Sequence, residues 1–386
     1  MVDPDPLLVF GPRSSAYDFG PGHPLTPERF GPGIDLLREF GGLPGLAPEP
    51  ASDDDLAACH DRRYIAAVGA FSADPERAPE AGIGPGGDDP PFAGMHDAAA
   101  AVAGGSLAAM VAILDGRNSH AFHPGGGLHH AMRDRASGFC IYNDPALAIA
   151  LARRADLHVL YVDLDVHHGD GVEAIHAADP GVMTVSIHES GRTLFPGTGP
   201  LDEAPPGAAP GSVVNVPLAA FSGAEVWLEA VERVVPLAAA GFGPDIVVSQ
   251  HGADTHAWDP LAHLRVTTTA MGAAARIVDA VAHEHAGGRW LATGGGGYDI
   301  YRVVPRAWAL VWLACAHRTP APGSPTPAAW RDRWAEAAVR FGTPGLPELL
   351  DDDPSVGAST DRLAAVADGA SRRVIDEVVA RLERGA

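Results

Sequence analysis

Short β-branched and apolar runs alternate with Ala-rich segments along most of the chain, and this alternation constrains the fold more than any other feature. We expect strands over residues 7–10, 119–123, 157–165, 182–188, 213–218, 245–250 and 289–293. We expect helices over residues 53–71, 97–115, 145–155, 223–240, 268–285 and 304–316. Strands that alternate with helices form parallel sheets covered on both faces. The pattern therefore predicts an α/β fold with an open, mainly parallel, doubly wound sheet and helices on both faces.

The domain organisation follows from length and from one Pro-rich stretch. The chain has 386 residues, of which 46% are hydrophobic, so one large domain can bury a sizeable core. We assign residues 1–316 to that domain. The stretch HRTPAPGSPTPAAW (317–330) resembles a linker, and it leads into a polar, helical extension that ends at residue 386. We expect the extension to pack on the domain, either as a cap or as an oligomer contact.

The formal charge limits the classes of partner. It is −22, from 27 basic and 49 acidic residues, so the phosphates of a nucleic acid would be repelled. A cationic partner would suit this charge, although a role in solubility alone explains it as well. We expect no nucleic-acid partner.

The sequence also bears on the cellular compartment. The first ten residues, MVDPDPLLVF, have neither a basic segment nor a long apolar stretch, so we expect no signal peptide. No run reaches the roughly 18 apolar residues of a membrane span, and we expect no membrane partner. The spacing of Cys59, Cys140 and Cys315 matches neither a zinc knuckle nor a disulfide framework. A reducing cytoplasm is the simplest interpretation.

Ionisable side chains gather just after four of the predicted strands. PGGGLHHAM follows 119–123, DLDVHHGD follows 157–162, HGADTHAWDP follows 245–250 and GGGGYD follows 289–293. Ligands of open α/β sheets bind beyond the carboxyl ends of the strands. The sequence therefore predicts one site at that edge of the sheet, built from four loops.

Metal binding is the first chemistry that these loops favour. Asp165 and His167 are two residues apart, so in an extended segment their side chains point to the same side. Asp254 is the best candidate for a third ligand, and three protein ligands leave a fourth position for water, as in catalytic zinc sites. The same donors also accommodate Fe²⁺, Co²⁺ or Mn²⁺. The alternative is a solvated turn with an Asp capping a helix that starts near Gly171.

Two adjacent histidines, His129 and His130, suggest proton transfer beside such a metal. A neutral imidazole can accept a proton from an activated water and deliver it to a leaving amine. Its other ring nitrogen needs an acceptor, and Asp163 and Asp170 are available for this. On their own, two histidines after a Gly run would indicate only a packed turn.

Tyr298 follows four glycines, which permit close backbone approaches. Its hydroxyl could therefore donate to a developing oxyanion opposite the metal. The alternative is a Gly-rich turn with a packed Tyr. The run is a poor nucleotide-binding signal, because no helix begins inside it.

Six stretches together resemble the zinc-dependent histone deacetylase superfamily, which has the arginase–deacetylase α/β fold. They are HPGGGLHHAMRDRASGFCIYND, YVDLDVHHGDG, MTVSIH, FPGTG, GADTHAWDPL and GGGGYD, in the family's order and across most of residues 7–315. The opening SSAYDFGPGHPLTPERF is most similar to bacterial acetoin-utilisation (AcuC-type) deacetylases. The resemblance makes residues 1–316 the catalytic domain, with the active site at the carboxyl ends of the strands.

The resemblance also implies a role for each matching residue. Asp165, His167 and Asp254 would hold Zn²⁺. His130, paired with Asp170, would be the general base and acid. His129, paired with Asp163, would be the second, more cationic histidine. Tyr298 would be the oxyanion donor. Phe139 and Phe195 would flank the acetyl-lysine stem, Gly138 would line the tunnel, and Leu261 and Asp88 would lie on the rim.

Monovalent cations complete what the family resemblance implies. A structural K⁺ would lie beside Asp163, Asp165, His167, Ser186 and Ile187, held mainly by backbone carbonyls. A second such site would lie near His176, Asp179, Val182 and Ser212, although these side chains depart from the usual pattern.

The expected reaction is hydrolysis of the acetamide of N-ε-acetyl-lysine in proteins to lysine and acetate. The main alternative is a hydrolase of acetylpolyamines or other small amides with the same catalytic residues. A binuclear manganese ureohydrolase would need more carboxylate ligands, and a non-catalytic acetyl-binding module would have lost a ligand or Tyr298. The partner is thus an acetylated protein or an acetylated amine.

Overall fold

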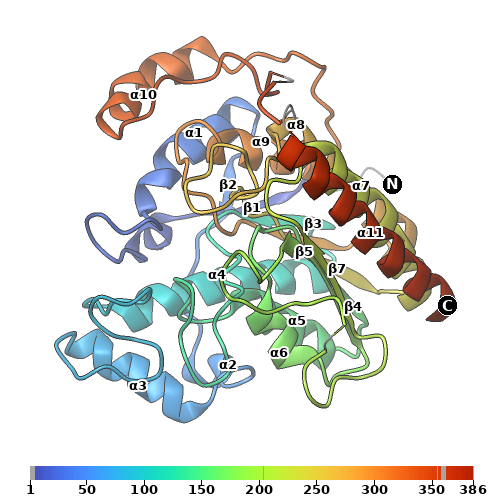
Figure 1. Ribbon diagram of the computed structural model, residues 1–386. Coiled ribbons are helices and arrows are strands. Elements are labelled where there is room, and N and C mark those ends of the chain that lie inside the picture. Colours follow the sequence, from blue (N-terminus) through green and yellow to red (C-terminus); the bar gives the residue numbers. More distant parts are fainter. Residues whose placement is uncertain (1–4, 203, 354, 358–361, 386) are drawn as a thin grey trace.

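A computed structural model describes residues 5–202, 204–353, 355–357 and 362–385 (Figure 1). In these residues eight strands form one sheet in the order β2-β1-β3-β8-β7-β4-β5-β6, and each neighbouring pair is parallel. The strands are β1 (Leu7–Val9), β2 (Pro44–Leu46), β3 (His120–His123), β4 (Val159–Asp163), β5 (Val182–Glu189), β6 (Val213–Leu218), β7 (Ile246–Gln250) and β8 (Trp290–Thr293). This sheet confirms the predicted α/β fold class.

Helices cover both faces of the sheet (Figure 1). They are α1 (Phe30–Glu39), α2 (Asp53–Leu56), α3 (Arg62–Ala73), α4 (Met95–Leu114), α5 (Asp144–Arg154), α6 (Asp170–His176), α7 (Ala224–Phe242), α8 (Thr268–His285), α9 (Val304–Cys315), α10 (Ala328–Arg340) and α11 (Arg362–Gly385). Short 3₁₀ turns span Pro12–Ala16 and Pro27–Arg29.

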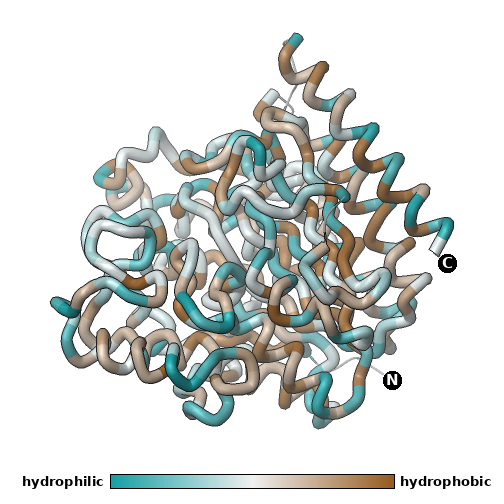
Figure 2. Tube along the Cα trace, turned by 60° about the horizontal axis from the view of Figure 1, so that its bottom comes forward, coloured by the Kyte–Doolittle hydropathy of each residue, from teal (hydrophilic) through white to brown (hydrophobic). Residues whose placement is uncertain are grey.

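Alternation along the strands divides the core into two layers. In β4, Leu160 and Val162 face a cluster formed with α1, α7, α8, α9 and α11, whereas Val159 and Tyr161 face a cluster formed with α3, α4 and α5. All four side chains are buried, since a parallel sheet covered on both faces has no solvent-exposed side. The hydropathy-coloured trace shows apolar residues concentrated along these inner elements (Figure 2).

All seven predicted strands are present, but the predicted helix over 53–71 is wrong. The chain leaves the helical path between α2 and α3, where the His60 ring binds the backbone of Met132 and of Asn143 and the Asp61 N–H donates to the Arg133 carbonyl. These long-range contacts outweigh the local helical propensity of the segment.

Strand β2 and helix α1 were missed, and α6 was anticipated only in the alternative of an Asp that caps a helix starting near Gly171. The first four residues of α1 are FGPG, a pattern typical of a turn. A Cβ on Gly31 would lie 2.5 Å from the ring of Trp334, and one on Gly33 would lie 2.5 Å from the ring of Trp308. These glycines therefore permit close packing against α10 and α9, which no local pattern reveals.

Helix α4 corrects the expectation that no segment is long and apolar enough to span a membrane. It is long and apolar enough to span a membrane by length and composition, but 67% of its most apolar window is buried inside the fold. It packs against α3, α5 and β3. We therefore describe it as a helix of the protein core.

The C-terminal segment, predicted as a linker and a helical extension, contains α10 and α11. Helix α11 packs against α7 and β6, and α10 contacts α1. Trp330 donates its indole N–H to the Pro32 carbonyl at 2.8 Å. Residues 354, 358–361 and 386 of this segment, and residues 1–4, lie outside the described residues.

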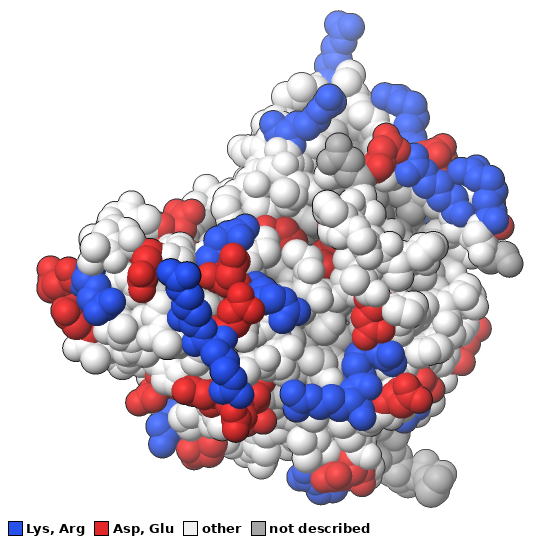
Figure 3. Space-filling model, turned by 90° about the horizontal axis from the view of Figure 1, so that it is seen from below, with Lys and Arg blue, Asp and Glu red and all other residues white. Residues whose placement is uncertain are grey.

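Two surface and core features bear on the predicted partners and compartment. Cys59, Cys140 and Cys315 are buried and free. On the face shown in Figure 3, Arg side chains are interspersed with Asp and Glu side chains. On that face the basic groups form mixed-charge clusters, whereas a nucleic-acid footprint would gather basic groups into one patch.

Candidate active site

The four loops predicted to carry chemistry follow strands that are neighbours in the sheet. These are β3, β8, β7 and β4, in that order. Because parallel strands end at the same edge, the loops converge there around a cavity of about 230 Å³. Its lining includes His129, His130, Asp165, His167 and Tyr298.

Asp165, His167 and Asp254 form a compact group at this cavity. His167 Nδ1 lies 2.9 Å from Asp165 Oδ1 and 3.2 Å from Asp254 Oδ2, and one ligand atom from each residue lies within 4.8 Å of the others. All three residues are buried. Burial and the charge of Asp165 raise the pKa of Asp254, because two carboxylates that face each other disfavour each other's ionisation.

Two observations indicate that this group fits a divalent metal. Asp254 Oδ2 is buried and, although His167 Nδ1 lies 3.2 Å away, makes no hydrogen bond of acceptable geometry, so one ligand atom faces the group unsatisfied. A Cβ on Gly296 would lie 1.9 Å from that oxygen, and a Cβ on Gly252 would lie 2.1 Å from Asp165 Oδ2. Glycines at both positions keep the space beside the carboxylates open.

The other carboxylate oxygens are held by neighbouring groups. Asp165 Oδ2 accepts from the Gln250 side chain at 2.7 Å and from the Gly296 N–H at 2.9 Å. Asp254 Oδ1 accepts from the Val166 N–H at 3.0 Å. Such outer contacts orient metal ligands, and Gln250, on β7, was not predicted.

The two predicted proton-transfer histidines lie side by side, and each has its own carboxylate. His129 Nδ1 lies 2.8 Å from Asp163 Oδ2, and His130 Nδ1 lies 2.7 Å from Asp170 Oδ1. The two Nε2 atoms are 3.0 Å apart. The structure thus brings together the four residues that the sequence paired.

Their surroundings make the two rings inequivalent. Burial alone would lower the pKa of His129, but the charges of Asp163 and Asp165 outweigh it and raise the pKa to about 9. Burial, together with the positive charge of His129, lowers the pKa of His130 to about 4. His130 is therefore the neutral imidazole of the pair at pH 7, and its Nε2 can accept a proton.

Helix α5 fixes the loop that carries these histidines. The Asn143 side chain donates to the carbonyls of His129 and Ala131, both at 3.0 Å. The Asp144 carboxylate accepts from the N–H groups of Gly127 and Leu128. Asn143 and Asp144 were not predicted as positioning residues, although both belong to the stretch that resembles the deacetylase family.

Tyr298 lines the cavity at the end of the Gly run. Its N–H donates to Asp259 Oδ2 at 2.9 Å, which positions the residue on the loop after β8. Burial and the charges of Asp254 and Asp165 hold its pKa well above the usual value, so the hydroxyl keeps its proton. It is a hydrogen-bond donor at neutral pH.

The predicted substrate-binding residues all line the same cavity. Phe139 packs edge-to-face on Tyr298 with ring centroids 6.0 Å apart, and Phe195 packs similarly on His130 at 5.1 Å. Phe195 is 42% exposed and Leu261 is 36% exposed, so both lie at the mouth. A Cβ on Gly138, where φ is +55°, would meet the rings of both His130 and Phe195.

Asp88 and Asp89 differ in exposure. Asp88 is exposed and lines the cavity, whereas Asp89 is buried, and burial with the neighbouring charge of Asp88 raises the pKa of Asp89 to about 8. Of the two, Asp88 is the one that lines the cavity.

Of the residues predicted around K⁺, Asp163 ends β4, Ser186 and Ile187 lie on β5, and Asp165 and His167 are in the loop that follows β4. Asp163 and Ser186 are register partners, and the Asp163 Oδ1 atom accepts from the Asp165 N–H at 3.2 Å. Ile187 is buried next to Ser186. Potassium binding at these residues stays a prediction.

The second predicted monovalent site is also still a prediction. The Asp179 carboxylate accepts from Arg153 at 2.9 Å. The Ser212 hydroxyl donates to the carbonyls of Ala177 and Ala209. Both side chains therefore already have protein partners.

Arg29 is a further residue at the site that the sequence analysis missed. It is buried, donates to the Gly295 carbonyl at 2.7 Å and lies near enough to Asp254 and Asp165 for their charges to act on it. Burial nevertheless lowers its pKa. A single Arg in the stretch PLTPERF carries no local signal of its place beside the cavity.

Comparison with known proteins places the chain among deacetylases. The family model for the histone deacetylase domain matches residues 23–315. The acetoin utilization protein AcuC of Bacillus subtilis is 42% identical over 337 residues, covering 86% of this chain and 86% of that protein. The AcuC protein of Staphylococcus xylosus is 36% identical over 352 residues, covering 89% and 90%.

A solved structure shares the fold. The crystal structure of an HDAC homolog complexed with SAHA superposes with a TM-score of 0.79 over 97% of this chain and 100% of that chain, at 24% identity. At that identity the likeness bears on the fold alone.

Proposed function

The chain belongs to the histone deacetylase family and is of its AcuC type, and from this membership we propose that it is a zinc-dependent protein lysine deacetylase. It would hydrolyse the acetamide of N-ε-acetyl-lysine to lysine and acetate. The observation that carries the proposal is the Asp165–His167–Asp254 group at a cavity that also presents two carboxylate-paired histidines and a protonated Tyr.

The metal would be held by Asp165, His167 and Asp254, whose single imidazole and two carboxylates suit Zn²⁺ and also accommodate Fe²⁺ or Co²⁺. Zn²⁺ at such a site supplies Lewis-acid polarisation and lowers the pKa of a water. We also propose that K⁺ binds beside Asp163 and Ser186 as a structural ion.

The remaining chemistry belongs to the protein's own side chains. His130 Nε2 accepts the proton of the attacking water, while Asp170 holds the opposite ring nitrogen and so fixes the tautomer. Protonated His130 then delivers that proton to the leaving amine. His129, cationic beside Asp163, adds positive charge, and the Tyr298 hydroxyl donates to the acetyl oxygen as negative charge develops there.

The cavity suits an acetylated lysine side chain. Phe139 and Phe195 form apolar walls for a methylene stem, and Asp88 offers a carboxylate on the rim for a substrate N–H. We assign this chemistry to residues 1–316 and propose that residues 317–386 support that domain from outside, through contacts such as that of α11 with α7. Three free, buried cysteines favour action in a reducing cytoplasm.

A second candidate is an acetylpolyamine deacetylase. The formal charge of −22 and the exposed Asp88 at the rim would attract a small polycation as well as a lysine-rich peptide. The test compares kcat/KM for an acetyl-lysine peptide and for N-acetylated polyamines with the zinc-loaded enzyme. A higher kcat/KM for the peptide supports the protein deacetylase; a higher value for the polyamines supports the alternative, and no acetate release from either substrate would contradict both.

A further inference from the structure

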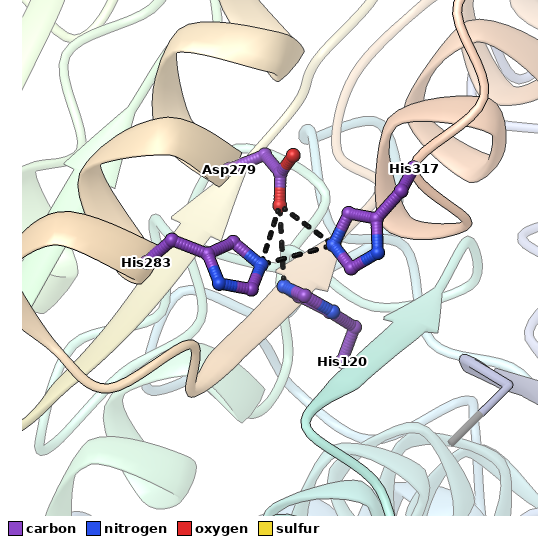
Figure 4. Close-up of side chains that lie close together, drawn as sticks. All are labelled: His120, Asp279, His283 and His317. Atoms are coloured by element: carbon purple, nitrogen blue, oxygen red, sulfur yellow. Dashed lines mark hydrogen bonds and ion pairs between the residues drawn. The ribbon is translucent and has the colours of Figure 1, made fainter. Parts of the chain in front are cut away.

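Three histidines and an aspartate converge at a second place, away from the catalytic cavity (Figure 4). We call His120, Asp279, His283 and His317 the His120 cluster. His120 begins β3, Asp279 and His283 are one turn apart on α8, and His317 follows the end of α9. His120 is at the amino end of β3, whereas the loop with His129 and His130 follows its carboxyl end. The cluster therefore lies at the end of the strands that is opposite the catalytic cavity.

The donor atoms of the His120 cluster have the spacing of a metal site. Asp279 Oδ1 lies 3.2 Å from the Nε2 atom of His120, 3.5 Å from that of His283 and 3.4 Å from that of His317. Four ligands with bonds of about 2.05 Å in tetrahedral geometry lie about 3.3 Å apart. The Nε2 atoms of His283 and His317 are 2.9 Å apart. All four donor atoms lie within 4.8 Å of one another.

The most buried donors of the cluster lack hydrogen bonds. His120 is 1% exposed, and its Nε2 atom and Asp279 Oδ1 are both buried without a hydrogen-bond partner, although they are only 3.2 Å apart. Buried polar atoms are nearly always satisfied, so an unsatisfied pair aimed into one small space requires an explanation. A cation between them would satisfy both.

The backbone and ring packing hold the cluster in this arrangement. His317 adopts φ +52°, a left-handed conformation that non-glycine residues seldom take, just after α9 ends. The three imidazole rings are mutually tilted by 52° to 80°, so they converge at an angle to one another, without stacking. The carboxyl ends of α8 and α9 both meet here, and their partial negative charge favours a cation.

We propose that the His120 cluster is a second metal site, in which three imidazole nitrogens and one carboxylate oxygen bind Zn²⁺ or a similar divalent transition metal. Imidazole and carboxylate donors suit this class of ion. Four protein ligands leave no open position, which is the arrangement of structural zinc sites. The ion would tie the start of β3 to the ends of α8 and α9.

Metal stoichiometry tests this proposal. The full chain is loaded with excess Zn²⁺ and desalted, and zinc per chain is measured by mass spectrometry. The test variants are His283→Ala/His317→Ala, which alters rings that are 40% and 38% exposed, and Asp279→Asn. The control is His285→Ala, which lies on the last turn of the same helix and outside the cluster.

The wild type and His285→Ala should retain one more zinc per chain than the double variant and Asp279→Asn, while circular dichroism and acetate release stay unchanged in all four. Equal zinc content in all four proteins after desalting would overturn the proposal. This holds whether the cluster never bound zinc or bound it too weakly to retain it through desalting.

Cobalt provides a second measurement that does not depend on the catalytic group. In the Asp254→Ala background, Co²⁺ titration should produce the visible absorption of four-coordinate cobalt, and adding His283→Ala/His317→Ala should abolish it. No such absorption in the Asp254→Ala protein, or an unchanged absorption after the double substitution, would contradict the proposal. Either result can be distinguished from a failure of the proposed function. That function is tested by acetate release from the zinc-loaded wild type, in which Asp254 is intact.

Discussion

The Nε2 atoms of His129 and His130 lie 3.0 Å apart, yet the two rings have opposite electrostatic surroundings. Asp163 and Asp165 raise the pKa of His129 above its usual value despite burial, whereas burial and the charge of His129 lower the pKa of His130. At pH 7 His129 is therefore the cationic ring of the pair and His130 the neutral one.

The first prediction follows from this asymmetry. His130→Ala should abolish nearly all activity, because the proton acceptor is lost, whereas His129→Ala should leave a measurable remainder. Asp170→Asn should resemble a partial His130 defect with metal retained. The measurement is kcat/KM against pH, with metal quantified in the same samples. Equal losses at the two histidines would leave the general base unassigned, and a larger loss at His129 would reverse the assignment.

The second prediction concerns the hydroxyl of Tyr298. Tyr298→Phe keeps the buried ring and deletes the donor, so kcat should fall by about 10²–10³-fold while substrate and metal still bind. Steady-state kinetics and metal analysis check this. Full kcat in the variant would rule out the hydroxyl as oxyanion donor.

The third prediction concerns stability in acid, through His60. Its Nε2 accepts from the Asn143 N–H at 3.0 Å and its Nδ1 lies 2.9 Å from the Met132 carbonyl, so the folded state needs the neutral ring. Burial lowers its pKa from 6.5 to about 4. Below pH 6.5 the unfolded chain binds the proton first, so His60 contributes its full stability above pH 6.5 and loses it progressively toward pH 4.

Comparing the wild type with His60→Gln isolates this effect. The difference in unfolding free energy between the two proteins should shrink as pH falls from 6.5 to 4, by at most about 3 kcal/mol. Urea unfolding at several pH values measures it, and other titrating groups cancel in the difference. A difference that is independent of pH would show that His60 titrates normally in the folded protein.

The fourth prediction concerns the attachment of the C-terminal segment. Asp352 lies 2.8 Å from Arg306 on α9 and 2.8 Å from His256, and all three side chains are almost fully buried. Asp352→Ala would leave Arg306 as an uncompensated buried charge, at a cost of about 3–5 kcal/mol. The neighbouring Asp353 is exposed, so Asp353→Ala is the matched control. If both variants unfolded at the same urea concentration, the buried pairing would contribute nothing to stability.

The sequence predicted those parts of the fold and site that depend on local pattern. The strand-end clusters could be identified because His129, Asp165, Asp254 and Tyr298 each follow a recognisable apolar strand, and parallel strands end at one edge. Helix α1 could not be predicted, because its glycines are explained only by the rings of α9 and α10 that pack closely against them.

Long-range groupings were also beyond local reasoning. Arg29 reaches the site from a short turn that lies far ahead of His129 and His130 in the sequence, and it donates to the Gly295 carbonyl. The members of the His120 cluster come from β3, from α8 and from the segment after α9, and only Asp279 and His283, four residues apart on α8, have a local spacing suited to metal ligands. Tertiary structure alone brings such residues together.

We propose that hydrolysis depends on a metal held by Asp165, His167 and Asp254. The most direct test measures acetate release from an acetyl-lysine peptide, together with metal per chain, in the zinc-loaded wild type and in Asp254→Ala. Removing one of three protein ligands should lower the metal content by one equivalent per chain and reduce acetate release to background. An Asp254→Ala protein that kept the wild-type metal content and near-normal turnover would contradict the assignment.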